Sequence, residues 1–123
     1  MIFLLLVQAS RHSEAGLKPG STLADALATY NEALAEAGVL VSREELETSA
    51  SGIRISYPEV GGEPFVAVGP FRPDEDRMVA AYTMIDVSSQ EEAIEWAMRM
   101  PDPNGFGEGH IELRQLKTKS GGY

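Results

Sequence analysis

The sequence predicts an α+β domain in which two helices cover one face of an antiparallel sheet. Two segments, residues 2–7 and 78–87, are apolar on both alternating faces, as expected for the central strands of a covered sheet. Two other segments, starting near residues 21 and 89, repeat apolar residues at helical spacing. Shorter segments of alternating polarity supply the remaining strands.

The first helix is predicted from an apolar stripe at spacings of four, three and four residues. The stripe consists of Leu23, Leu27, Tyr30 and Leu34. We expect Ser21 or Thr22 to cap its start, and Gly38 to end it in a left-handed conformation. The preceding residues, 13–20, include glycine and proline and are expected to form a loop.

A β-hairpin is predicted between the two helices, after extended residues 39–41. Residues 53–57 alternate apolar and polar side chains, which indicates a strand with one face exposed to solvent. Gly61 and Gly62 would turn the chain, and residues 65–68 would form the returning arm.

The second helix is predicted to start in a capping box, formed by Ser89 and Glu92. Its inner stripe consists of Ala93, Trp96, Ala97 and Met100. Ile111 and Leu113 then alternate with polar residues in a last strand. We expect residues 1–116 to form a single domain and residues 117–123 a flexible tail.

The predicted element order is strand, helix, strands, strand, helix and strand, which fits a ferredoxin-like fold. Both helices would lie on one face of the sheet and leave the other face open. Because the central strands are apolar on both sides, that open face needs a cover. The most economical cover is the sheet of a second copy, so we expect a homodimer formed through the sheet faces.

The composition narrows the range of partners. Ten Lys plus Arg residues against nineteen Asp plus Glu give a formal net charge of -9. A phosphate backbone or an anionic membrane would be repelled, so we expect neither nucleic acid nor membrane as a partner. The chain has no cysteine, which fits a cytoplasmic location. The apolar start is short and has no preceding basic residue, so we interpret it as a strand and not as a signal peptide.

Several segments in this order resemble the YCII-related family, in particular the group named for an Asp-Gly-Pro-Phe motif. This chain has Val68 where that motif has aspartate, followed by Gly69, Pro70 and Phe71. The other matching segments are Ser13 to Gly16, Tyr30 to Glu32, Ala37 to Leu40, Glu91 to Trp96, Pro101 to Pro103 and His110 to Leu116. The resemblance therefore extends over nearly the whole chain.

The resemblance implies a ferredoxin-like fold that dimerises through its sheets into an α/β barrel. Two functions are considered, besides a dimeric domain without surviving activity. The apolar two-sided sheet and the polar residues near it favour the binding of a small organic ligand between sheet and helices or at the dimer seam, with lyase-like or isomerase-like activity. The alternative is a non-enzymatic module associated with a transcription regulator of the extracytoplasmic sigma type, for which the acidic residues 74–76 would offer a docking surface. A His and Asp pair is a proposed active site in the wider family, and Val68 removes the motif carboxylate.

The candidate catalytic residues are His12 and His110, because only histidine titrates near neutral pH without a large pKa shift. Solvated or interface positions are the alternative for both. The candidate ligand-pocket residues are Ser10, Tyr30, Asn31, Phe71, Arg77 and Tyr82. Tyr30 and Asn31 come from the family resemblance, although helical spacing also places Tyr30 in the core. We expect no metal and no cofactor.

Overall fold

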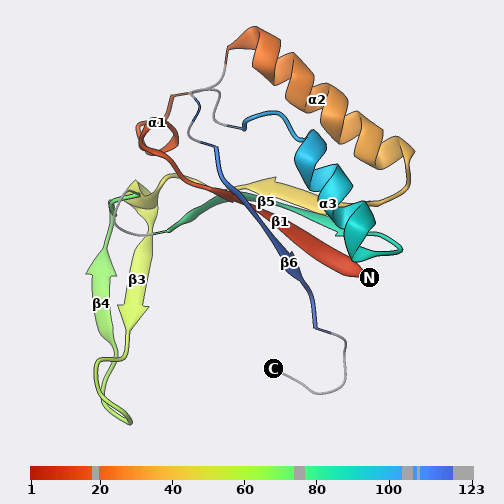
Figure 1. The fold of residues 1–123 in the computed structure, drawn as a ribbon. Helices are drawn as coiled ribbons and strands as arrows, with labels where there is room; N and C mark the ends of the chain where they lie inside the picture. Colours follow the sequence, from red (N-terminus) through yellow and green to blue (C-terminus); the bar gives the residue numbers. More distant parts are fainter. Residues whose placement is uncertain (18–19, 74–76, 104–106, 108, 118–123) are drawn as a thin grey trace.

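A computed structural model describes residues 1–17, 20–73, 77–103, 107 and 109–117. The chain forms, in order, β1 (Ile2–Gln8), α1 (Arg11–Glu14), α2 (Ser21–Glu36), β2 (Leu40–Glu45), the short 3-10 helix η1 (Ser49–Ser51), β3 (Ile53–Ser56), β4 (Phe65–Val68), β5 (Val79–Asp86), α3 (Gln90–Arg99) and β6 (Ile111–Gln115). Helices α2 and α3 lie over the same face of the main sheet (Figure 1). The predicted α+β class, with two long helices on one face, is confirmed.

The main sheet has four strands in the order β2-β5-β1-β6, and every neighbouring pair is antiparallel. This order is compatible with a ferredoxin-like fold. The two strands predicted to be central, β1 and β5, occupy the middle of the sheet. Along β1 the burial alternates between fully buried and half-buried residues, so both faces of the strand carry apolar side chains.

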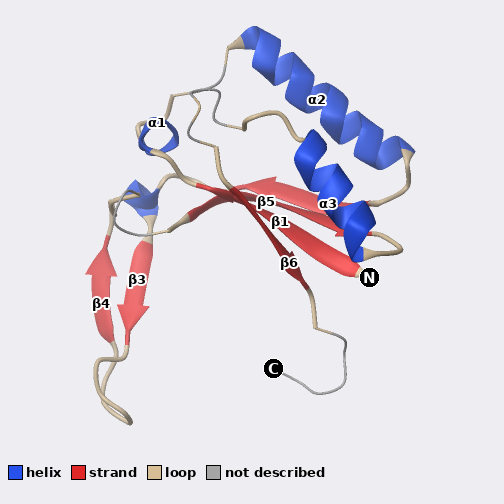
Figure 2. Ribbon diagram, in the orientation of Figure 1, coloured by secondary structure: helices blue, strands red, loops and turns tan. Residues whose placement is uncertain are grey.

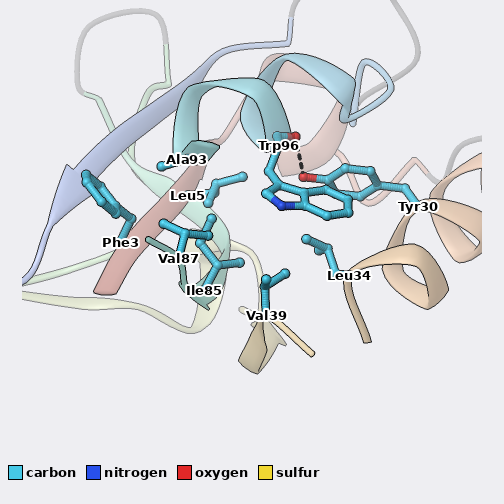
Figure 3. Close-up of a cluster of buried hydrophobic side chains, with 9 residues drawn as sticks. All are labelled: Phe3, Leu5, Tyr30, Leu34, Val39, Ile85, Val87, Ala93 and Trp96. Carbon is cyan, nitrogen blue, oxygen red and sulfur yellow. Dashed lines mark hydrogen bonds between the residues drawn. The ribbon is translucent and has the colours of Figure 1, made fainter. Parts of the chain in front are cut away.

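The hydrophobic core lies between this sheet and helices α2 and α3 (Figure 3). Its members are Phe3, Leu5, Tyr30, Leu34, Val39, Ile85, Val87, Ala93 and Trp96. The hydroxyl of Tyr30 donates a 2.6 Å hydrogen bond to the backbone carbonyl of Trp96. Burial raises the pKa of Tyr30 to about 12. The predicted helical stripes are therefore confirmed as the inner faces of α2 and α3.

Strands β3 and β4 form a hairpin that does not join the main sheet (Figure 2). The hairpin itself is confirmed, but the prediction that only one of its faces is exposed to solvent is wrong. Ile53 and Val68 are 66% and 72% exposed, although the face that carries Ile53 was expected to be covered. The polar Arg54 is instead half-buried, with its guanidinium 3.9 Å from the centre of the Phe71 ring. No second layer of described residues packs on this hairpin, so its apolar side chains face solvent.

Three local predictions about helix ends are corrected by the structure. The predicted loop at residues 13–20 contains the end of helix α1, whose N-cap is Ser10. Helix α2 starts from Gly20, with no side-chain cap, although Gly38 has the expected positive φ of 73°. At α3 the Ser89 hydroxyl accepts from the backbone of Glu92, but the Glu92 carboxylate accepts from Ser88 instead of completing the box.

Some predictions fall on residues that the structure does not describe. The acidic residues 74–76 and most of the tail, 118–123, lie outside the described residues. In the part of the chain that is described, no helix is both long enough and apolar enough to cross a membrane.

Candidate functional site

A cavity of about 540 Å³ lies between α2, the neighbouring strands β2 and β5, and the segment around α1. We call it the α2–β5 cavity. Val7, Ala81 and Thr83 contribute to it from the sheet, and Leu27 and Asn31 from α2. The register pairs Val7 with Ala81 across β1 and β5, so these side chains share the face of the sheet that the helices cover.

The small side chains of the first half of α2 explain why this space is open. Tyr30 and Leu34, in the second half of the helix, are buried in the core. Nearer the start of the helix, the cavity is lined by Ala24 and Ala28, which are both exposed, and by Leu27, which is only half-buried. An alanine reaches no further than its Cβ, so the helix leaves a gap above the sheet there instead of a packed layer.

Thr83 is the most deeply buried polar side chain of the cavity lining, with 5% of its surface exposed. Among the described residues, its hydroxyl has no hydrogen-bond partner. Asn31 also lines the cavity, half-buried, and its side-chain amide likewise makes no hydrogen bond within the described part of the chain. The Thr83 hydroxyl and the Asn31 amide can each donate and accept a hydrogen bond. Each can therefore orient a polar group of a ligand in the cavity.

Charged side chains border the cavity on the β2 side. Arg43 pairs with Thr83 in the β2–β5 register, and Glu45 pairs with Ala81, so both charged residues share the helix-covered face. Glu44 lies between them and alternates to the other face of the strand. Glu47 follows just after the end of β2 and also lines the cavity. Arg43, Glu45 and Glu47 are exposed, which places them at the mouth of the cavity. Glu44 is also exposed, but on the other face of the sheet.

Glu14 lines the cavity from α1 and also connects α1 to the hairpin. Its carboxylate accepts hydrogen bonds from Ser49, one from the backbone N–H at 3.0 Å and one from the hydroxyl. The Ser49 hydroxyl oxygen in turn accepts a 2.8 Å hydrogen bond from the backbone N–H of Phe71. This chain of contacts holds the base of the hairpin against the wall of the cavity.

The Gly69-Pro70-Phe71 segment has a packing role in this structure. A Cβ on Gly69 would collide with the backbone carbonyl oxygen of Ser49, so only glycine fits at this close approach. Phe71 is held by its backbone bond to Ser49 and by Arg54 over its ring. Val68, immediately before this segment, is exposed on β4 and is not part of the cavity lining.

The structure brings only some of the candidate pocket residues together. Tyr30, Asn31 and Tyr82 line the α2–β5 cavity. The hydroxyl of Tyr30 is already used by Trp96, and Tyr82 pairs with Leu6, which places it on the opposite face of β5 from Thr83. Asn31 is therefore the predicted residue that is best placed to contact a ligand.

The other candidates lie away from the cavity lining. Ser10 caps α1, exchanging hydrogen bonds of 3.1 and 2.7 Å with Ser13. Arg77 and His110 are exposed, and His12 is half-buried in α1. None of these three, nor Phe71, lines the cavity.

Sequence reasoning missed Thr83 as a candidate site residue, and it noted Arg43 and Glu45 only as departures from the family pattern around the expected pocket mouth. The available signal was one hydroxyl within the otherwise apolar segment 78–87. The charges of β2 carried no such signal, because the sequence does not show that α2 leaves this part of the sheet uncovered. Within the described ranges, no three His, Asp or Glu side chains cluster in a way that could hold a metal ion.

The comparisons with known proteins agree with the fold. The family model described as the YCII-related domain matches residues 1–118, which is nearly the whole chain. No curated protein matches the sequence significantly.

Proposed function

The chain belongs to the YCII-related domain family, and we propose that it binds a small organic molecule in the α2–β5 cavity. The observation that carries this proposal is Thr83, a residue only 5% exposed, whose hydroxyl makes no hydrogen bond with the described residues on the wall of a cavity of about 540 Å³. Pockets for small molecules are commonly of about 300–1,000 Å³, largely apolar and equipped with a few convergent polar groups. Leu27, Ala28 and Ala81 supply the apolar lining here, and Thr83 and Asn31 supply the polar groups.

Any reaction of lyase or isomerase type would need a proton-transferring group in the cavity. His12 and His110 lie outside the lining, so they do not support such a role. Four described lining residues carry carboxylates, but that of Glu14 is bonded to Ser49 and that of Glu44 lies on the other face of β2. Glu45 and Glu47 are therefore the remaining candidates for a base. The proposal is therefore first a binding function, with proton transfer as an activity that would depend on these glutamates.

We also propose that the chain forms a homodimer through the helix-free face of the sheet, giving the α/β barrel that the family resemblance implies. Ile2, Leu4, Leu6 and Met84 alternate with the core residues and are half-buried in the single chain. The hairpin extends away from the helices, on the same side as this face (Figure 1). Two apolar surfaces of one chain can cover each other in a pair of copies related by a twofold axis.

A fragment screen followed by a cavity-filling variant tests the binding function. We expect fragments with an apolar body and one polar group to raise the melting temperature of the wild-type protein. Ala28→Phe would fill the cavity and abolish this increase. Ala26→Phe is the matched control, because Ala26 is exposed on α2 and does not line the cavity. A screen in which no fragment binds, or in which both variants respond like wild type, would contradict the proposal.

A further inference from the structure

The charge of the cavity mouth indicates which class of ligand the α2–β5 cavity accepts. Among the described lining residues, four are carboxylates and one is a guanidinium. The carboxylates are Glu14, Glu44, Glu45 and Glu47, and the guanidinium is Arg43. The side chain of Glu44 lies on the other face of β2, so three carboxylates remain on the side of the cavity. Opposite charges attract and like charges repel a ligand on its way into a cleft. The excess of carboxylates therefore favours a cation over an anion, as does the net charge of -9 of the whole chain.

An acidic mouth alone does not define a ligand, but the buried end of the cavity adds a second observation. Thr83 is 5% exposed, and its hydroxyl oxygen has no donor among the described residues. Asn31 brings an amide oxygen from α2 to the same cavity, also without a donor in the described part of the chain. An ammonium group has three donors and no acceptor, so it can donate to either oxygen.

Among the described lining residues, Arg43 is the one like charge that such a ligand would meet, and it lies directly opposite Thr83 in the β2–β5 register. It shares the helix-covered face with Glu45, two residues further along β2, and neither makes an ion pair with a described residue. Of the two carboxylates on β2, Glu45 is the one on the helix-covered face, because it pairs with Ala81. The two side chains therefore act in opposite directions on a charged ligand, and each is free to do so.

We infer that the α2–β5 cavity takes a primary amine with an apolar body, whose ammonium group binds at Thr83 and Asn31 within the acidic mouth formed with Glu45 and Glu47. The apolar body lies between the alanines of α2 and the sheet. This inference rests on the proposed binding function and specifies the ligand of that same cavity. No covalent step is involved.

Three probes with the same phenylethyl body and different charge test the inference. They are phenethylamine, which is a cation at neutral pH, hydrocinnamate, which is an anion, and hydrocinnamamide, which is neutral. Dissociation constants are measured by NMR titration of the isotope-labelled protein at low and high salt. We expect the amine to bind most tightly, and its advantage over the amide to shrink at high salt because exposed charges are screened.

Two substitutions on one strand face give the inference its sharpest control. Glu45→Gln is expected to weaken phenethylamine binding by about two- to fivefold, the range of an exposed ion pair. Arg43→Gln is expected to strengthen it, because a like charge is removed. Both variants should leave the affinity for hydrocinnamamide unchanged. A merely structural role of these residues would not produce opposite signs for the amine together with no effect on the amide.

The possible outcomes separate the inference from the proposed function. If hydrocinnamate or hydrocinnamamide binds more tightly than phenethylamine, the amine inference is wrong and the cavity remains a small-molecule site. If Glu45→Gln and Arg43→Gln change the amine affinity in the same direction, the assigned charge roles are wrong. If none of the probes binds and the fragment screen is also empty, both the inference and the proposed function fail.

Discussion

Thr83 of β5 lies directly opposite Arg43 of β2, so a buried hydroxyl and an exposed guanidinium face the same cavity. Most cross-strand neighbours on a helix-covered face pack against each other or against the helix above. Here the α2 residues that line the same cavity include the small Ala24 and Ala28. The arrangement leaves polar groups available to a ligand at a point where the rest of the sheet is sealed by the core.

Thr83→Val tests whether the hydroxyl serves the ligand or the fold. Valine has nearly the same shape, so we expect the melting temperature to stay the same or to rise. Phenethylamine binding should weaken by about two- to tenfold, the value of one lost hydrogen bond. Thr29→Val is the matched control, since Thr29 is exposed on α2 and does not line the cavity. A strongly destabilised Thr83→Val protein would show that the hydroxyl supports the fold.

Tyr30 is predicted to make the protein less stable at alkaline pH. Its pKa is raised from 10.0 to about 12 by burial. Between these two values the unfolded chain has lost the tyrosine proton while the folded chain keeps it, so stability falls as pH rises through this window. Below pH 10.0 this contribution is fully present. The free energy of unfolding, measured at several alkaline pH values, should therefore fall more steeply with pH for wild type than for Tyr30→Phe.

The substitution Tyr30→Phe has a separate effect at neutral pH. The Met100 backbone N–H bonds to Ala97, so the hydroxyl of Tyr30 provides a donor for the carbonyl of Trp96 at the end of α3. Losing it leaves that carbonyl buried without this donor. We expect Tyr30→Phe to lower the free energy of unfolding by about 1–3 kcal/mol. If the two proteins showed equal stability at neutral pH and parallel alkaline curves, the Tyr30–Trp96 bond would have no energetic role.

Gly69→Ala is predicted to be strongly destabilising. The new Cβ would collide with the carbonyl oxygen of Ser49, which is backbone and cannot rotate away. We expect a loss of about 2 kcal/mol or more, as for other overpacked positions. Gly20→Ala is the matched control, because a Cβ there meets no atom within 4 Å. Equal denaturation midpoints for the two variants would remove the packing role assigned to Gly69.

The proposed homodimer predicts a particular response to charge on the helix-free face. Light scattering at micromolar concentration should give twice the mass of the chain. Met84→Arg places a charge in the middle of that face and should give a monomer. Met98→Arg introduces the same side chain on α3, at a position that is 81% exposed, and should leave the dimer intact. A wild-type monomer would disprove the dimer proposal.

The elements that could be predicted from sequence are those with a strong local period. The stripe that includes Tyr30 and Leu34 specified the inner face of α2, and the two-sided apolar pattern placed β1 and β5 in the middle of the sheet. The hairpin was predicted as a hairpin, but alternation along Ile53 and Ile55 shows only that two faces differ. It does not show whether anything covers either face.

The site was less predictable because it depends on the absence of large side chains from the first half of α2. Ala24 and Ala28 read as ordinary helix formers, yet their small size opens the cavity. Thr83 differs from its neighbours only by one hydroxyl. The two histidines were chosen as candidates for their residue type alone. Their positions in the fold lie outside the cavity lining.

The most direct test of the central claim is an NMR titration of the labelled protein with phenethylamine, following every assigned backbone amide. The account predicts that the perturbed amides surround the α2–β5 cavity, including those of Asn31, Ala81 and Thr83, and that Ala28→Phe abolishes these shifts. Perturbations confined to the hairpin or to the helix-free face, or no saturable perturbation with any fragment, would contradict it.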